Sequence, residues 1–219
     1  MSELKKKKEI IKYSRFFETN KFSPIRSGNI SIRHKRKNLE GFLISPSGKK
    51  NIELITNDIV FVSMSGEAEK NKKPSSEWRF HLDLYKSNKC NAIVHAHSKF
   101  SVICSCLFQE IPSFHYMIAL TEAKNIKLAK YSLFGSKNLS KNILDAIKDS
   151  KSCLISNHGQ VAVGNNIEKA YELAQEVELI CEYYYYCKLY KEPKIISKKE
   201  MNLVLNKIIG YKNGAPRQN

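Results

Sequence analysis

The stretch Asn91-Ala92-Ile93-Val94-His95-Ala96-His97 is a short apolar run that ends in two histidines. An apolar run of this length is typical of a buried strand. Residues two apart on a strand point to the same face of the sheet, so both imidazoles would reach one site at the end of the strand. Such a pair can bind a metal from one wall, or it can be two histidines with ordinary hydrogen bonds. A catalytic zinc needs a third ligand.

Other histidines could supply that third ligand: His81, His115 and His158. His158 follows a strand-like segment and precedes Gly159, a position that presents a side chain at the end of a neighbouring strand, and we favour it. His81 lies four residues after Glu77 on one helix face, so it is a core residue or a partner that supports the site.

Hydrophobic periodicity predicts the elements around this run. The predicted strands are residues 29–33, 41–45, 58–64, 91–97, 152–156 and 160–163. The predicted helices are residues 3–19, 77–85, 99–108, 139–149, 167–190 and 198–209. Repeats, linkers and low-complexity tracts are absent from the sequence, so we expect one mixed α/β domain over residues 1–219.

Composition narrows the classes of protein. The formal net charge is +16, but the lysines are spread along the chain, and we expect them to attract phosphorylated metabolites rather than nucleic acid. Apolar runs of the roughly 18 residues that a membrane span requires are absent, and the N-terminus does not resemble a signal peptide. We therefore expect a cytoplasmic protein with no membrane contact. The six cysteines favour reduced, mostly buried thiols.

Several turns combine small residues with hydroxyl groups. Ser75-Ser76 is expected to cap the helix that begins with Glu77, and there the free N–H groups could bind a phosphate while the carboxylate points into the same cavity. Gly28-Asn29 and Ser45-Pro46-Ser47-Gly48 could also approach a phosphate closely. Taken singly, each of these turns is more often only a turn.

Taken together, these segments resemble the class II aldolase/adducin family in order and spacing, over about residues 8–211. The resemblance rests on the following segments: Gly28-Asn29-Ile30-Ser31-Ile32-Arg33, Ser45-Pro46-Ser47-Gly48, Pro74-Ser75-Ser76-Glu77-Trp78-Arg79-Phe80-His81, His95-Ala96-His97, Ile111-Pro112-Ser113-Phe114-His115-Tyr116-Met117-Ile118 and Asn157-His158-Gly159. It implies a three-layer α/β/α domain with a mostly antiparallel central sheet, assembled as a homotetramer with active sites between subunits.

The resemblance also implies roles. Glu77, Tyr116 and, in the C-terminal tail, Tyr211 would be catalytic. Zn²⁺ would be held by His95, His97 and His158, with Glu77 as a further ligand when substrate is absent. The substrate phosphate would be bound by Gly28, Asn29, Ser47, Gly48, Ser75 and Ser76.

The reaction implied is reversible cleavage of L-fuculose 1-phosphate, or a close ketose 1-phosphate, to dihydroxyacetone phosphate and L-lactaldehyde. The segment Leu120–Lys124 and Lys130 depart from the pattern, so the aldehyde end of the pocket, with Phe134 as one wall, is left open. The alternatives are an aldolase for 5-deoxy- or methylthio-pentulose 1-phosphates, a pentulose-phosphate 4-epimerase, or a methylthioribulose-phosphate dehydratase. A metal-free adducin-like binding module and a basic nucleic-acid binder are less favoured.

Overall fold

The apolar run around His95 is strand β4, at the centre of the sheet. In the computed structural model, residues 1–87 and 90–212 are described, except for the side chains of Ile209, Tyr211 and Lys212. The strand order in this part is β3-β2-β1-β4-β8-β7-β6-β5, and every neighbouring pair is antiparallel except β6 and β7. The strands are β1 (Asn29–Arg36), β2 (Leu39–Ile44), β3 (Val60–Ser63), β4 (Ala92–Ala96), β5 (Glu110–Ile111), β6 (Ile126–Ala129), β7 (Ser152–Ile155) and β8 (Gly159–Gly164).

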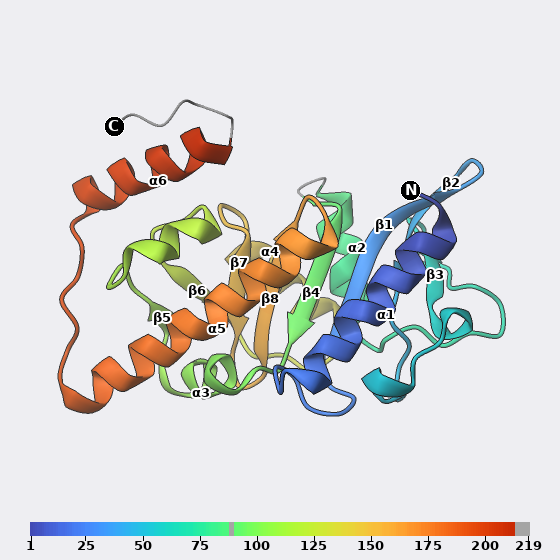
Figure 1. Ribbon diagram of the computed structural model, residues 1–219, viewed down its shortest axis with the longest axis horizontal. Coiled ribbons are helices and arrows are strands. Elements are labelled where there is room, and N and C mark those ends of the chain that lie inside the picture. Colours follow the sequence, from blue (N-terminus) through green and yellow to red (C-terminus); the bar gives the residue numbers. More distant parts are fainter. Residues whose placement is uncertain (88–89, 213–219) are drawn as a thin grey trace.

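Helices cover both faces of this sheet, and the predicted α/β/α layering and mostly antiparallel sheet are confirmed. In Figure 1, α1 and α5 lie in front of the sheet and α2 lies behind it. The helices are α1 (Glu3–Thr19), α2 (Trp78–Lys86), α3 (Lys99–Leu107), α4 (Lys137–Ala146), α5 (Ile167–Tyr190) and α6 (Lys198–Lys212), with short 3-10 helices η1 (Asn51–Glu53), η2 (Thr56–Asp58) and η3 (Tyr116–Thr121).

The alternation of side chains along β4 determines on which face of the sheet the histidine cluster lies. Ala92, Val94 and Ala96 belong to the core under α1, α3 and α5, whereas Ile93 belongs to the second core under α2 and α4. His95 therefore points to the α2 side, where its ring meets the edge of Phe80 with the ring centroids 5.5 Å apart. Burial of β4 on both faces explains why its sequence is apolar without alternation.

The structure differs from the predicted elements around the site in two places. Strands β5 and β6 and helix η3 lie in the stretch from 110 to 129, where no element was predicted. Helix α2 begins at Trp78, so Glu77 occupies the N-cap position and the expectation that Ser76 caps the helix is wrong. Ser75, rather than Ser76, bonds the backbone at the start of the helix: its Oγ accepts a hydrogen bond from Glu77 N at 3.3 Å.

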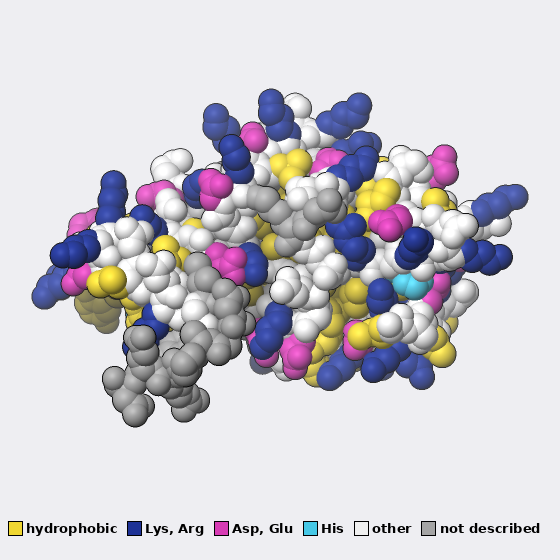
Figure 2. All heavy atoms as spheres, turned by 90° about the horizontal axis from the view of Figure 1, so that it is seen from above, with side chains coloured by type: hydrophobic (Ala, Val, Ile, Leu, Met, Phe, Trp, Pro, Cys, Tyr) yellow, Lys and Arg dark blue, Asp and Glu magenta, His cyan; other side chains and the backbone are white. Residues whose placement is uncertain are grey.

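Basic residues are distributed over the surface. Figure 2 shows Lys and Arg side chains around the rim and across the visible face, interspersed with Asp and Glu, rather than gathered over one element. Within the described residues, every helix falls short of the length or hydropathy that a membrane span needs. The six thiols are free, and two of them, on Cys106 and Cys187, are exposed.

Candidate active site

Two neighbouring strands bring the three predicted histidines together. His95 lies in β4 and His97 directly follows it, while His158 lies in the tight turn that joins β7 to β8. Asn157 holds that turn with φ of 54°, a left-handed conformation that Asn tolerates better than most residues. Gly159 is required for space, because a Cβ there would lie 2.4 Å from the Ala96 carbonyl oxygen.

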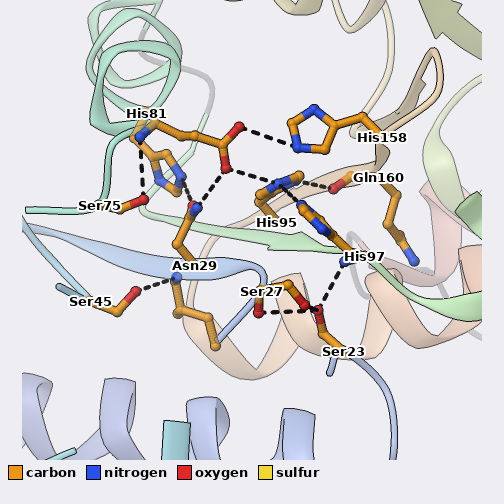
Figure 3. A network of polar contacts seen from close by, with 12 residues as sticks. Ser23, Ser27, Asn29, Ser45, Ser75, His81, His95, His97, His158 and Gln160 are labelled. Carbon is orange, nitrogen blue, oxygen red and sulfur yellow. Dashed lines mark hydrogen bonds and ion pairs between the residues drawn. The ribbon is translucent and has the colours of Figure 1, made fainter. Parts of the chain in front are cut away.

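The three imidazoles form a triangle (Figure 3), and Glu77 belongs to the same group of potential metal ligands. The centroids of the three rings are 4.6–4.9 Å apart. His95 Nε2 lies 3.0 Å from His97 Nε2 and 3.1 Å from Glu77 Oε2, and His158 Nε2 lies 3.4 Å from Glu77 Oε1. The four candidate ligand atoms lie within 4.8 Å of one another.

One histidine of the triangle is held in a defined tautomer. His95 Nδ1 donates a hydrogen bond to the Gln160 carbonyl oxygen at 2.8 Å, so its Nε2 faces the cluster. A hydrogen bond from the outer ring nitrogen to a carbonyl is the usual support for a metal-binding histidine. The Gln160 amide is fixed in turn, since its Nε2 donates to the Ala174 carbonyl oxygen at 3.0 Å and to Ser98 Oγ at 2.8 Å.

The charges in the cluster depend on one another. Burial alone would raise the pKa of the Glu77 carboxyl, but the nearby charges of His95, His158 and His97, with the hydrogen bond from His95, hold the pKa well below its usual range. Burial and the neighbouring histidines lower the pKa of His97 to about 3, and burial with the charge of His95 lowers that of His158 to about 4. Burial acts in the same direction on His95, but Glu77 outweighs it and raises the pKa of His95.

This donor set fits a divalent metal. Three imidazoles with a carboxylate are typical catalytic zinc ligands, and bonds of about 2.0–2.1 Å in a tetrahedron separate ligand atoms by about 3.3 Å. The spacings of 3.0–3.4 Å between neighbouring ligand atoms here are close to that value. Glu77 Oε1 is buried without a hydrogen-bond partner in the described residues, so it is open to a metal or a proton.

A buried hydrogen-bond chain fixes the other carboxylate oxygen. Asn29 Nδ2 donates to Glu77 Oε2 at 3.0 Å, so Asn29 Oδ1 must face His81 Nε2, 2.5 Å away. His81 therefore carries its proton on Nε2, and its Nδ1 accepts from Ser31 Oγ at 2.7 Å. Ser31 in turn accepts from the Tyr85 hydroxyl at 2.7 Å. His81 thus supports the site from behind rather than joining the triangle.

Neutral His81 predicts a pH dependence of stability. Burial, with the charge of His95, lowers its pKa from 6.5 to about 3 in the folded protein. As the pH falls below about 6.5, His81 becomes protonated in the unfolded state but stays neutral in the folded state. The free energy of unfolding therefore decreases by about 1.4 kcal/mol per pH unit. In urea unfolding of metal-free protein at pH 7.5 and 5.5, we expect the wild type to lose about 1.4 kcal/mol more than His81→Gln. Equal losses in the two proteins would contradict the prediction.

A pocket of about 240 Å³ opens above the cluster, and it contains every residue predicted to bind phosphate. Its lining consists of Arg26, Ser27, Gly28, Asn29, Pro46, Ser47, Gly48, Ser75, Ser76, Glu77, His97, Phe134 and His158. Gly28 is required here, because its φ is +77° and a Cβ would lie 2.6 Å from the His95 carbonyl oxygen. Arg26 and Ser27 were missed by the sequence reasoning, which named Pro46 only as part of a turn.

Tyr116, one of the two predicted catalytic tyrosines, is absent from the lining of this pocket. Tyr116 begins η3, is 53% exposed and lies tilted beside the His115 ring, with the ring centroids 5.1 Å apart. The family resemblance implies that Tyr116 reaches into the site of a neighbouring subunit, and this stays a prediction. Tyr211 lies in α6, and its side chain is outside the described residues.

A larger hollow, of about 410 Å³, lies elsewhere, around the outer part of β1 near Arg33 and His34. Its lining shares no residue with the cluster of potential metal ligands found in the described residues. Size therefore does not identify the functional pocket in this molecule, whereas the chemistry of the lining does.

Comparison with known proteins agrees with this geometry. Residues 8–185 match the family model described as class II aldolase and adducin N-terminal domain. A 5-methylthioribulose-1-phosphate/5-deoxyribulose-1-phosphate aldolase of Rhodospirillum rubrum is 40% identical over 190 residues, which cover 86% of this chain and 84% of the relative. An L-fuculose phosphate aldolase of Haemophilus influenzae is 40% identical over 189 residues, covering 84% of this chain and 85% of the relative.

The fold has a close match among solved structures. An L-fuculose 1-phosphate aldolase superimposes with a TM-score of 0.88 at 32% identity, covering 94% of this chain and 96% of the other. The similarity therefore extends over nearly the whole chain.

Proposed function

This chain belongs to the class II aldolase and adducin family and is a carbon–carbon lyase of the aldolase type, and we propose that it is a zinc-dependent aldolase that cleaves L-fuculose 1-phosphate, or a close ketose 1-phosphate, reversibly. The observation that carries this proposal is the cluster of Glu77 with three histidines at the floor of a pocket lined by serine hydroxyls and glycine turns. The products would be dihydroxyacetone phosphate and, from L-fuculose 1-phosphate, L-lactaldehyde.

We assign the metal to His95, His97 and His158, with Glu77 as a further ligand in the absence of substrate. A bound divalent metal supplies Lewis-acid stabilisation of the negative charge that develops on the ketose oxygens during cleavage. The hydrogen bond from His95 to the Gln160 carbonyl keeps one imidazole aimed at the site. The lowered pKa of His97 and His158 keeps their rings neutral and able to act as ligands at neutral pH.

Glu77 is the proposed acid and base. In the direction of synthesis, its carboxylate removes a proton from C3 of dihydroxyacetone phosphate, and that carbon then attacks the aldehyde carbon. Oε1 is the oxygen available for this proton, because Oε2 already accepts the hydrogen bond from Asn29. The alkoxide formed on the former aldehyde oxygen takes a proton from Tyr116, which we place in a neighbouring subunit. Cleavage reverses these steps, so that Glu77 returns the proton to C3.

The phosphate would occupy the hydroxyl-lined part of the pocket. We propose that it is bound by Gly28, Asn29, Ser47, Gly48, Ser75 and Ser76. The hydroxyls of Ser47 and Ser76 make no hydrogen bond within the described residues, which leaves them free to donate to phosphate oxygens. The side-chain amide of Asn29 is already hydrogen-bonded to Glu77 and His81. Asn29 would therefore contact the phosphate through its backbone.

A second substrate class deserves equal testing. The Rhodospirillum rubrum relative is named for 5-methylthioribulose and 5-deoxyribulose 1-phosphates, at the same 40% identity as the Haemophilus influenzae relative. All of these ketoses end in an apolar methyl or methylthio group far from the phosphate. Phe134 lines the pocket and is exposed, so it would provide an apolar wall for that end in either case.

The proposal includes an assembly. We expect a cytoplasmic homotetramer in which each site is completed by a neighbour, and Tyr116 is the residue we expect to cross. Tyr131 and Leu133 lie close to Phe134 in the sequence, and each is 65% exposed. Large apolar side chains exposed together in this way support a subunit interface there.

The direct test is release of dihydroxyacetone phosphate, measured with a coupled dehydrogenase. L-fuculose 1-phosphate, 5-deoxyribulose 1-phosphate and 5-methylthioribulose 1-phosphate are each given to zinc-loaded and to chelated protein. We expect cleavage that disappears with chelation and returns with zinc, and the ketose with the highest kcat/KM identifies the substrate. If metal is bound but none of the three ketoses is cleaved, the aldolase proposal fails and the epimerase and dehydratase readings come next.

A further inference from the structure

Arg26 lines the pocket and has no partner among the described residues. Of the arginines in the described part of the chain, the others are all engaged: Arg15 with the Leu54 carbonyl, Arg33 with the Tyr85 carbonyl, Arg36 with Glu3 and Glu69, and Arg79 with the Trp78 ring. Arg26 alone makes no hydrogen bond, ion pair or ring contact there, although it is exposed and lines the pocket.

The backbone that carries Arg26 is strained. Ile25, the preceding residue, has φ of 50°. Such a conformation is a genuine outlier for a β-branched residue. Strain of this kind persists only where the surroundings impose it, and it is concentrated at binding and catalytic sites.

Hydrogen bonds impose this conformation from both sides. Ile25 O accepts from Asn51 N at 3.1 Å, and Pro24 O accepts from both the N and the Oγ of Ser27, at 2.8 and 2.7 Å. Ser23 Oγ bonds to Ser27 Oγ at 3.1 Å and accepts from the backbone N of His97 at 3.0 Å (Figure 3). The turn that holds Arg26 is therefore joined directly to a proposed metal ligand.

The charges around the pocket favour an anion beside Arg26. Glu77 is the only carboxylate among the lining residues, and it is already engaged by His95 and His158. The rest of the polar lining in the described structure comprises the Asn29 amide, the imidazoles of His97 and His158, serine hydroxyls and the backbone at glycine turns. The hydroxyls and backbone N–H groups can donate to phosphate oxygens. A guanidinium offers a fork of donors that matches two oxygens of one phosphate.

We propose that Arg26 is a phosphate-binding residue, whose guanidinium contacts the phosphate monoester of the substrate from the open side of the pocket, opposite the serine hydroxyls. This inference rests on the proposed function, because it takes the substrate to be a ketose 1-phosphate. The residue sets specificity for phosphorylated ketoses and acts on binding rather than on the proton transfer at Glu77.

Inorganic phosphate tests the inference without turnover. Its dissociation constant is measured by calorimetry on zinc-loaded wild type, Arg26→Ala and Arg26→Lys, with Lys141→Ala on the exposed face of α4 as the charge-matched control. We expect Arg26→Ala to weaken phosphate binding about 10-fold, which corresponds to about 1.4 kcal/mol, Arg26→Lys to weaken it less, and Lys141→Ala to leave it unchanged. Equal affinity in wild type and Arg26→Ala overturns the inference.

Kinetics separate this inference from the proposed function. With the preferred ketose phosphate, Arg26→Ala should raise KM about 10-fold and change kcat less than 3-fold, the pattern of lost binding that is uniform in ground and transition states. Inorganic phosphate should inhibit the wild type competitively and Arg26→Ala about 10-fold less strongly. A fall in kcat at unchanged KM overturns the assignment to phosphate binding. If the wild type cleaves no ketose phosphate, the proposed function fails, whereas the calorimetry still decides whether Arg26 binds an anion.

Discussion

Replacement of Glu77 by Gln is expected to lower kcat for ketose phosphate cleavage by about 10³. The amide is nearly isosteric with the carboxylate but has no site that can accept or return the C3 proton, and loss of a general acid or base costs on the order of 10²–10⁴. The half reaction gives the sharper measurement. Exchange of the C3 proton of dihydroxyacetone phosphate with deuterated water, followed by NMR, requires no aldehyde and no contribution from Tyr116.

The controls for Glu77→Gln distinguish proton transfer from metal binding. Glu172→Gln, on the exposed face of α5, removes a carboxylate of the same type far from the pocket and should leave exchange unchanged. Glu77→Gln should retain zinc through the three histidines, as measured by elemental analysis. Exchange at the wild-type rate in zinc-loaded Glu77→Gln would remove Glu77 from the mechanism.

The second large effect is expected from His97→Ala, which should lose the metal. One of three imidazole donors disappears, and because loss of even a supporting partner costs 10- to 100-fold in metal affinity, we expect a fall of more than about 100-fold. Cleavage should fall with the metal content. His97 suits this test better than His95, since its side chain is only partly buried and its removal leaves a smaller void in the core.

Competition with a chromogenic chelator measures the zinc affinity of each variant. His34→Ala is the matched control, because His34 lies in β1 beside Glu3, outside the ligand cluster. Its zinc affinity and activity should equal those of the wild type. Zinc affinity in His97→Ala within 10-fold of the wild type, with an unchanged urea midpoint, would contradict the assignment of His97 as a ligand.

Long periodic segments of the fold could be predicted, whereas two of the short strands, β5 and β6, could not. Residues 3–19 and 167–190 were predicted as helices with the bounds that α1 and α5 have, because each carries several turns of apolar periodicity. Strand β5 has two residues, which is too short for a period to appear. The four residues of β6 include Lys127, so they lack the apolar run that marks β3 and β7. β6 forms its parallel ladder with β7, and such a pairing depends on a distant segment.

The site was predictable where chemistry and spacing coincide. His95 and His97 share a face because a strand has a period of two, and the cluster with Glu77 and His158 followed from the family resemblance. Arg26 left almost no signal, since a single arginine in a turn looks like any exposed cation. Its distinction is the absence of a partner, which only tertiary structure reveals.

The proposed histidine ligands of the metal lie in or directly beside β4 and β8, and this placement separates folding from metal binding. Both strands are interior to the sheet and carry ladder partners on each side, so their amides should exchange with solvent only through global opening. The ligand atoms therefore keep their positions before the metal arrives, unlike zinc fingers, which are unfolded without metal. Loss of zinc should abolish the proposed activity without exposing the core to proteolysis. Added zinc should restore that activity without a refolding step.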